Sequence, residues 1–573
     1  MQTSRIEPEP SPSAEQDLER HFLRALRQRF KAEVNRLTGG AMEKLLAGDP
    51  EAHDLSFLLS YVYAFEWLRR DVHPRYRALV VAPYRQGGRG FLMDLLLEAD
   101  DAAGVVRCFV DQMIGLSDEG LRERQQVMRL LCSCGNDPER LVERALDAWH
   151  KLGLLDPSYP AAYRALAREE RERYGGMLGA EDRERLALVD ALPDPPGPAP
   201  AFSKLGVIPA MGCPQTCRHC MFIWRPPMRN VPDPGGLYRL VAAHTDSVLF
   251  TGGDLTRHLN HFVRAIREMG AVRTFAILLN ADFAGDRATT EAVLRDMAAA
   301  VRERPRAWPA ARVLLQVSFD EFHQEILAEP DGVLRERIPV AKIANTVECA
   351  PAHPQIQLCL VHKQTALNFS MDLFRKGVFG RLVEELGRRG HQVQIVGASP
   401  SPRLKEHPLE PGRTGQVVKD ASFVLARFPD RPILLTSSTI DAYGRAALLD
   451  PGETVNERAL LWRMLEGHDV GSEAFDTDLM FWLNGWATLF SAVHVCLGNL
   501  YEDGADQVLA RHRKDPLTAA LGAFDRRLLR FYGEVRDDLQ DLVDRATGPH
   551  HLFHRLTERP DVRLHMTRRL VGA

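Results

Sequence analysis

Three closely spaced cysteines constrain this chain more than any other feature of its sequence. They are Cys213, Cys217 and Cys220, in the segment Cys-Pro-Gln-Thr-Cys-Arg-His-Cys. Three thiolates at positions 1, 5 and 8 of one segment can hold three irons of a cubane [4Fe–4S] cluster, and the fourth iron then has no protein ligand. Because an open iron can bind and reduce a small molecule, the spacing predicts a reactive metal centre.

Two other interpretations of this triad remain open. A zinc site usually pairs Cys-x2-Cys with a second, distant pair of ligands, so His219 or a remote histidine would have to complete it. The three cysteines could also be unrelated core residues, although they share the segment with Pro214, Gln215 and Arg218. We favour the iron–sulfur interpretation because the triad is compact and has no evident second half.

The composition indicates a globular protein of several domains. A chain of 573 residues is too long for one ordinary hydrophobic core. The net charge of -4 gives no electrostatic reason to expect a nucleic-acid partner or an anionic membrane surface. Residues 1–20 lack the basic and apolar regions of a signal peptide, and no apolar run approaches the length of a membrane span, so we expect a cytoplasmic protein. Nine cysteines, three of them clustered, favour reduced thiols over a disulfide framework.

Changes of pattern divide the chain into regions. Residues 1–13 are predicted to be a disordered tail, and apolar residues at helical spacing predict a helical accessory domain over 14–192. Five prolines within 193–200 predict an extended linker. Residues 201–430 alternate short apolar runs with helical stretches and form the predicted core. The C-terminal extension, 431–573, is mixed at first and then mostly helical.

The core region predicts a mainly parallel sheet with helices outside it. Alternating strands and helices produce such a sheet, which can curl into a full or partial barrel. The expected strands are 205–209, 248–251, 275–279, 313–319, 356–361 and 393–396, and the expected helices lie near 235–244, 257–269, 288–303, 321–328 and 369–389. The cysteine segment follows the first strand, at the end where α/β barrels place their chemistry.

Across about residues 201–400, the chain resembles the radical S-adenosylmethionine (SAM) enzymes. This family has a Cys-x3-Cys-x2-Cys loop after the first strand of a partial (βα)6 barrel. The expected fold is therefore α/β: a radical SAM core, an all-α N-terminal domain and a mixed, mostly helical C-terminal extension. The resemblance implies Cys213, Cys217 and Cys220 as cluster ligands. His219 takes the place of the family's usual aromatic residue, whose backbone commonly contacts the adenine of SAM.

Two further segments match places where the family contacts SAM. Gly252, Gly253 and Asp254 end the second expected strand, where the family has a Gly-Gly-Glu that binds the amino group of SAM. Glycines there let the backbone approach a ligand closely. Ser318 and Asp320 end the fourth strand, where family members often contact the ribose or carboxylate of SAM. Each of these two could equally well cap a helix.

Two single residues complete the predicted site. Gly397 ends the sixth expected strand, where the family's backbone often lies near adenine. His323 is the one candidate for a catalytic proton donor or acceptor, although a lone histidine at a helix start is more often structural. No other catalytic residue is predicted.

Two segments of the C-terminal region resemble the SPASM extension, which in its complete form binds auxiliary iron–sulfur clusters. They are 434–445 and 495–503, but of the cysteines that such clusters need, only Cys496 follows the core. Complete auxiliary clusters are therefore not expected. We interpret Cys349, Cys359 and Cys496 as small buried hydrophobic residues.

The resemblance implies a reaction and its cofactors. A reduced [4Fe–4S] cluster cleaves SAM to a 5′-deoxyadenosyl radical, which abstracts hydrogen from a substrate, and a flavodoxin- or ferredoxin-type protein supplies the electron. The leading hypothesis is modification of a ribosomally synthesised peptide or protein, because of the SPASM-like extension and the large N-terminal domain. One alternative is a radical SAM enzyme of small-molecule natural-product or cofactor biosynthesis, and another is a structural zinc-binding scaffold protein.

Overall fold

The computed structural model describes residues 165–573 with short gaps. The gaps are 167, 172, 174–176, 195–201, 214, 216, 218, 223–227, 229–230, 325, 329–333, 366–367, 370–373, 376, 408–411, 450–453, 469–474 and 573. The predicted tail, most of the helical accessory domain and most of the linker lie outside the described residues. Of the two compact units of the chain, the larger contains Tyr163–Glu325 and Glu336–Ala573, and the features below belong to it, except strands β5 (Ile326–Ala328) and β6 (Leu334–Glu336).

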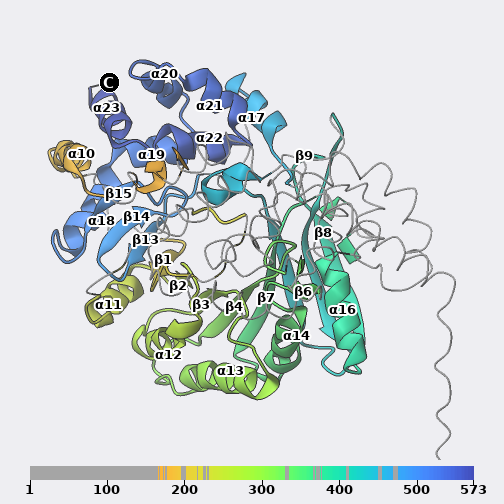
Figure 1. Ribbon diagram of the computed structural model, residues 1–573. Coiled ribbons are helices and arrows are strands. Elements are labelled where there is room, and N and C mark those ends of the chain that lie inside the picture. Colours follow the sequence, from red (N-terminus) through yellow and green to blue (C-terminus); the bar gives the residue numbers. More distant parts are fainter. Residues whose placement is uncertain are drawn as a thin grey trace, which may run out of the picture. The chain divides into compact units, whose positions relative to one another are not determined.

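One large mixed sheet organises this unit (Figure 1). Its order is β15-β14-β13-β1-β2-β3-β4-β7-β12-β11-β8. The strands are β1 Leu205–Ile208, β2 Ser247–Phe250, β3 Thr274–Leu279, β4 Arg312–Ser318, β7 Ile356–Lys363, β8 Val393–Pro400, β11 Val418–Leu425, β12 Ile433–Ser438, β13 Leu479–Trp482, β14 Trp486–Leu489 and β15 Cys496–Asn499. The central run from β13 to β12 is parallel, whereas β14, β15, β11 and β8 join at the edges in antiparallel pairs.

Helices cover the outer side of the central strands (Figure 1). They are α11 Gly235–His244, α12 Leu259–Glu268, α13 Arg287–Arg302, α14 Val340–Cys349 and α16 Val378–Arg388. Local sequence explains their boundaries: at α13, for example, the Asp286 side chain accepts a hydrogen bond from the Thr289 backbone N–H at 2.8 Å. Strand β1 is buried along its whole length, as expected for a parallel strand covered on both faces. The predicted α/β class is thus confirmed.

The first five predicted strands are confirmed in order, but the assignment of the sixth is wrong. Residues 393–396 belong to β8, which lies at the edge of the sheet and pairs antiparallel with β11. Strand β12 takes the place beside β7 and runs parallel to it. The β8–β11 ladder is inserted between β7 and β12 in the sequence. A short apolar run indicates a strand, but it does not say which strand lies beside it.

Two predicted helices also differ from the structure. Residues 321–324 form a turn and are followed by β5 (Ile326–Ala328), which pairs with β6 (Leu334–Glu336), so no helix covers 321–328. The turn forms because the Asp320 carboxylate accepts hydrogen bonds from two backbone N–H groups just after it. The regular helix predicted near 369–389 is α16, which begins only at Val378.

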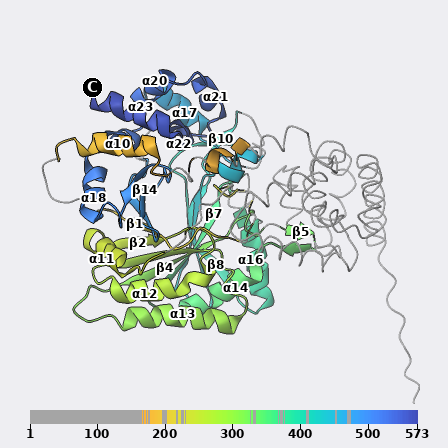
Figure 2. The same cartoon turned by 60° about the vertical axis from the view of Figure 1, so that its left-hand side comes forward.

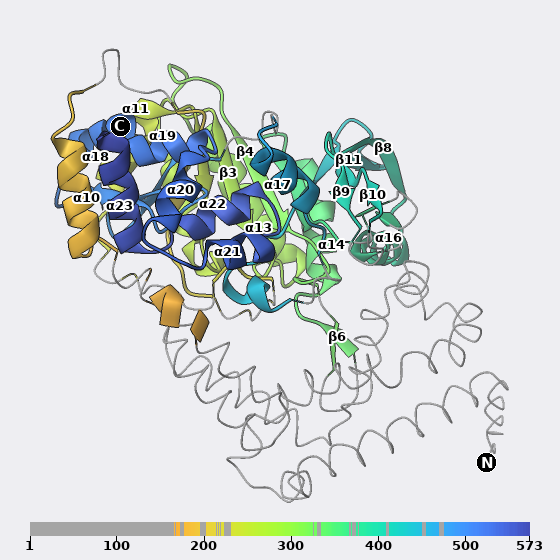
Figure 3. The same cartoon turned by 90° about the horizontal axis from the view of Figure 1, so that it is seen from above.

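Strands from both sides of the boundary predicted at residue 430 belong to the same sheet. Strand β12 completes the parallel part of the core sheet, and β13 pairs with β1 on the other side. Helix α17 (Arg458–Leu465) precedes β13, and beyond β15 the chain is helical, as predicted. The helices after β15 are α18 Ala505–Lys514, α19 Pro516–Gly522, α20 Arg527–Gly533, α21 Leu539–Arg545, α22 Pro549–Leu556 and α23 Pro560–Val571. Figure 3 shows α18–α23 away from β8 and α16.

The predicted boundary at residue 192 is crossed by strong contacts. Helix α10 (Ala180–Asp190) lies along α23 (Figure 2). The Asp182 carboxylate binds the Arg563 guanidinium through two hydrogen bonds of 2.9 and 2.6 Å, and both side chains are buried. Arg185 of α10 likewise pairs with Asp515 at 2.8 Å. The residues just before the linker therefore pack with the C-terminal helices. None of the helices in the described part is both long enough and apolar enough to span a bilayer.

Candidate functional site

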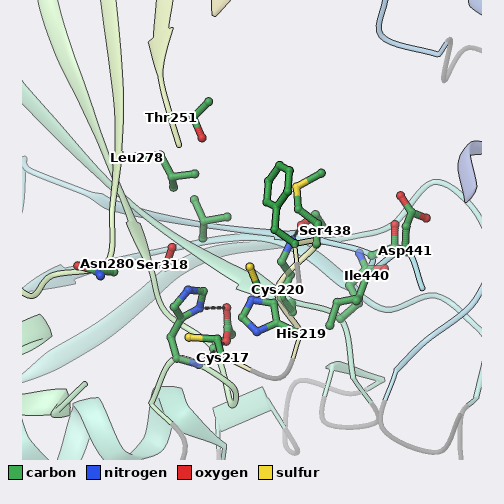
Figure 4. Close-up of a pocket in the computed structure, with 18 of the residues that line it drawn as sticks. Cys217, His219, Cys220, Thr251, Leu278, Asn280, Ser318, Ser438, Ile440 and Asp441 are labelled. Atoms are coloured by element: carbon green, nitrogen blue, oxygen red, sulfur yellow. Dashed lines mark hydrogen bonds and ion pairs between the residues drawn. The ribbon is translucent and has the colours of Figure 1, made fainter. Parts of the chain in front are cut away.

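A cavity of about 930 Å³ lies at the carboxyl ends of the parallel strands (Figure 4). Each strand from β1 to β12 in the parallel series contributes to it. Examples in that order are Cys220, Thr251, Asn280, Ser318, Lys363 and Ser438. Its volume is at the upper end of the usual range for ligand pockets. The parallel topology therefore collects polar side chains from six separate segments at one end of the sheet.

The predicted cysteine triad forms part of this lining. Cys213, Cys217 and Cys220 lie on the loop after β1 and form no disulfide in the described part of the chain, and all three line the cavity. Burial raises the pKa of Cys217 to about 12, although the nearby charges of Arg337 and Arg445 act to lower it. Without a bound metal, Cys217 is therefore protonated at neutral pH. Three thiols on one short loop facing one cavity are a donor set that suits an iron–sulfur cluster.

The Gly-Gly segment after β2 packs directly on the cysteine loop. Gly253 N–H donates to the Ala210 carbonyl at 2.9 Å, and Asp254 N–H donates to the Gly212 carbonyl at 2.8 Å. A Cβ on Gly253 would lie 2.3 Å from the Gly212 carbonyl oxygen. Gly252 has φ of +148°, and a Cβ there would lie 2.3 Å from the carbonyl oxygen of Ala210. Both glycines line the cavity, so they let two loops meet at its wall.

Asp254 lies beside these glycines but is not part of the cavity lining. Its carboxylate accepts hydrogen bonds from the Thr256 backbone N–H at 3.1 Å and from the Thr256 hydroxyl at 2.7 Å. The side chain therefore holds the turn that leads into the short 3-10 helix η2 (Thr256–His258). The structure assigns a local structural role to this carboxylate, beside the ligand contact that the sequence predicts.

Asp320 and His323 form a hydrogen-bonded pair in the cavity wall. His323 Nδ1 lies 2.8 Å from the Asp320 carboxylate, which also accepts from the backbone N–H groups of Phe322 and His323. Burial would raise the pKa of Asp320, but its interaction with His323 and these hydrogen bonds hold the pKa well below its ordinary value. The ionised carboxylate accepts from His323 Nδ1–H and so fixes the ring, while Nε2 takes no part in this hydrogen bond. Ser318, two residues earlier, also lines the cavity.

His219 lies beside this pair in the cavity lining. Its ring packs edge-on against His323, with centroids 4.6 Å apart, and against Phe322 at 4.9 Å. Burial lowers the pKa of His219 well below its ordinary value, so its ring is neutral at pH 7. Nδ1 is buried and has no hydrogen-bond partner in the described part of the chain. The aromatic position of the motif is thus filled by a neutral ring in a packed environment.

Gly397 is not brought to the site. It lies in β8, where it pairs with Ser422 of β11, and it is absent from the cavity lining. Its assignment depended on β8 being the sixth parallel strand. Because β12 has that place, the end of β12 supplies the cavity residues Ser438 and Asp441 instead.

Arg445 was not predicted as a site residue. It follows β12 in the 3-10 helix η5 (Gly444–Leu448), and this segment contacts the cysteine loop, since Ala446 N–H donates to the Cys220 carbonyl at 3.3 Å. The Nε and Nη2 atoms of Arg445 are buried and have no hydrogen-bond partner among the described residues. Arg445 as a whole is half-buried. Charged nitrogen atoms removed from water are costly unless they are paired, so this guanidinium is suited to an anionic group beside the cysteines. No motif in the sequence indicates this placement.

The remaining described cysteines are structural. Cys349, Cys359 and Cys496 are buried free thiols, which confirms their interpretation as small hydrophobic residues. Burial raises the pKa of Cys496 to about 12, and its thiol donates to the Gly498 carbonyl at 3.4 Å. None of the three lines the cavity.

Comparisons with known proteins assign no family to the chain. No protein-family model matches the sequence, and no curated protein matches it. The function therefore has to be argued from the site itself.

Proposed function

We propose that this protein is a radical SAM enzyme whose cysteine loop holds a [4Fe–4S] cluster. The observation that carries the proposal is the meeting of Cys213, Cys217 and Cys220 with Gly252 and Gly253 at one cavity wall. This wall lies at the carboxyl ends of adjacent parallel strands, where α/β folds bind ligands. The parallel strands β1 to β12 would then form the partial (βα)6 barrel of that family.

The residues of the site have separable tasks in this proposal. When bound, the cluster supplies the electron that cleaves SAM reductively, yielding the 5′-deoxyadenosyl radical. The three cysteines hold the cluster, while the backbone of Gly252 and Gly253 gives SAM close access to the cavity wall. The walls exclude water from a reactive species.

Polar side chains of the β4 end orient ligands in the same proposal. The hydroxyl of Ser318 lies in the lining and is available to the ribose or carboxylate of SAM. His323, fixed through Nδ1 by Asp320, presents Nε2 as a proton acceptor.

We further propose a peptide or protein substrate, as the SPASM-like segments indicate. In the structure the first of these segments, 434–445, contributes Thr439, Ile440 and Asp441 to the cavity lining. A cytoplasmic location and a flavodoxin- or ferredoxin-type electron donor belong to the same proposal, because the reduced cluster needs a reducing compartment.

The test is anaerobic reconstitution followed by quantification of 5′-deoxyadenosine with SAM and dithionite. The wild type should bind about four irons and four sulfides per chain and form 5′-deoxyadenosine. A Cys213→Ala/Cys217→Ala/Cys220→Ala variant should do neither. A matched Cys349→Ala/Cys359→Ala/Cys496→Ala variant removes three buried thiols outside the cavity and should retain the cluster.

Two results would contradict the proposal. Zinc without iron or sulfide in the wild type would place the protein in the structural-zinc class. Equal 5′-deoxyadenosine formation by the cavity triple variant would show that these cysteines do not hold the reactive metal.

A further inference from the structure

Two lysines converge on the carboxyl end of β12, in the lining of the same cavity. Lys363 ends β7, and its ammonium donates to the Ser438 hydroxyl at 2.9 Å. Lys419 lies in β11, at an irregularity of the β8–β11 ladder between Val418 and Asp420, and its ammonium donates to the Ser437 carbonyl. Because Ser437 and Ser438 are neighbours, the two ammonium groups approach the same strand end from both sides. We call Lys363 and Lys419 the lysine wall.

The lysine wall has no anionic partner in the described part of the chain. Neither ammonium group lies within ion-pair distance of a carboxylate there, although the cavity's other lysines do: Lys204 pairs with Asp476, and Lys405 pairs with Glu457. Burial lowers the pKa of Lys363, as expected for a cation whose charge is poorly compensated.

Two acids of the cavity lining act on Lys363 through their charge, Asp320 first and Asp441 second. The Asp320 carboxylate is already bonded to His323 Nδ1 and to the backbone N–H groups of Phe322 and His323. Burial raises the pKa of Asp441, while the charges of His550 and Lys363 act to lower it, and its carboxylate accepts a 3.3 Å hydrogen bond from the Tyr443 hydroxyl. Each carboxylate is therefore bound elsewhere, and the two ammonium groups remain available to a further anion.

Neutral hydrogen-bonding groups surround the two lysines. The hydroxyl-bearing residues Ser401, Ser438 and Thr439 line the same cavity. Ammonium groups combined with hydroxyls form a suitable binding site for a group with several oxygens and a negative charge, because charge-assisted hydrogen bonds are the stronger ones. Lys419 belongs to the β8–β11 ladder, outside the parallel strands that carry the cysteine and Gly-Gly loops.

We propose that the lysine wall binds an oxyanion of the substrate, a carboxylate or a phosphate, through Lys363 and Lys419. The assignment of this oxyanion to the substrate rests on the proposed radical SAM function, whereas the anion site itself does not. The substrate class is thus an acidic molecule or peptide segment, held by its charge while another part of it faces the cysteine loop.

Lysine footprinting tests the site directly on the wild-type full chain, with no need for a loaded cluster. The protein is acetylated briefly in sodium phosphate, in sodium succinate or in chloride of equal ionic strength, and each modified lysine is quantified by mass spectrometry. At an anion concentration of ten times Kd, acetylation of Lys363 and Lys419 should slow about tenfold, by mass action. Lys204 is the internal control, since it lines the cavity but is already paired, and its rate should not change.

A Lys419→Gln variant provides the second measurement. It removes one of the two ammonium groups, and the loss of one hydrogen bond to a charged group weakens binding about tenfold. The anion concentration that halves the acetylation rate of Lys363 should therefore rise about tenfold. Protection by phosphate or by succinate identifies which oxyanion the site prefers, and either result supports the proposal.

Three results would overturn the anion site. The first is that neither anion protects Lys363 and Lys419 from acetylation. The second is that Lys204 is protected to the same extent, which indicates only an effect of ionic strength. The third is that SAM alone protects Lys363 and Lys419 in the reconstituted protein, which assigns these lysines to the cofactor. Because footprinting does not use 5′-deoxyadenosine formation, a failure of the radical SAM proposal remains distinguishable from a failure of the anion site.

Discussion

Replacing Gly253 with alanine should damage the cysteine loop while leaving the rest of the fold intact. A Cβ at this position would lie 2.3 Å from the Gly212 carbonyl oxygen and 2.4 Å from that of Met211. These neighbours are backbone atoms, so no side chain can rotate away. Relieving the overlap requires the two loops to separate.

The loss of unfolding free energy expected for Gly253→Ala follows from two physical routes. Overpacking of this kind typically costs about 1–3 kcal/mol. Separating the loops instead breaks the hydrogen bonds from Gly253 N–H to Ala210 and from Asp254 N–H to Gly212, at about 1 kcal/mol each. Both routes agree on a destabilisation of about 2 kcal/mol, concentrated at the site that the cluster is proposed to occupy.

The assay combines urea unfolding with iron and sulfide content after anaerobic reconstitution. Gly253→Ala should lose stability by this amount and bind much less iron and sulfide than the wild type. Gly236→Ala is the matched control: nothing lies within 4 Å of its added Cβ, and it sits in helix α11. It should be neutral or stabilising by up to about 1 kcal/mol. If Gly253→Ala unfolds like the wild type and binds a full cluster, the close-packing argument is wrong.

Three further predictions concern charged and titratable groups. Arg445→Met should stabilise the metal-free protein to heat but lower its iron content, because it removes a half-buried cation whose Nε and Nη2 have no hydrogen-bond partner among the described residues; reduced thermal stability would contradict this. Asp182→Asn should cost about 3–5 kcal/mol in urea unfolding, since Arg563 would remain buried without its ion-pair partner. Burial and neighbouring arginines lower the pKa of His551 and of His554 to about 3, so their neutral forms favour folding above pH 6.5. Unfolding free energy should therefore fall from about pH 6.5 towards pH 3, by at most about 1.4 kcal/mol per pH unit for each histidine, and a flat profile between pH 7 and 5 would refute it.

Local sequence patterns determined much of the core. Apolar runs that separate helical stretches identified β1, β2, β3, β4 and β7 in their correct order. They did so because a strand covered on both faces is apolar throughout and its crossover helix is amphipathic. The same patterns failed at residues 321–328, where hydrogen bonds to one carboxylate, Asp320, form a turn instead of a helix.

Spacing along the chain likewise determined which residues of the cysteine and Gly-Gly loops belong together. Cys213, Cys217 and Cys220 are close in sequence, and the loop after β2 is adjacent because β2 pairs with β1. A motif whose residues are close in the sequence can therefore be recognised without knowing which distant strands pair. Its assignment as an iron–sulfur site remains a proposal.

Only the tertiary structure decided which distant segments complete the cavity. Strand order placed β12 rather than β8 beside β7. This excluded Gly397, brought Ser438 and Lys419 into the cavity lining and placed the segment of Arg445 beside the cysteine loop. The sequence does not distinguish a lysine or arginine that lines a cavity from one in solvent. Only the fold shows whether burial removes its water and whether a carboxylate lies near it. The sequence alone thus determined the strand–helix core and the thiol donors, whereas long-range strand pairing decided which charges face them.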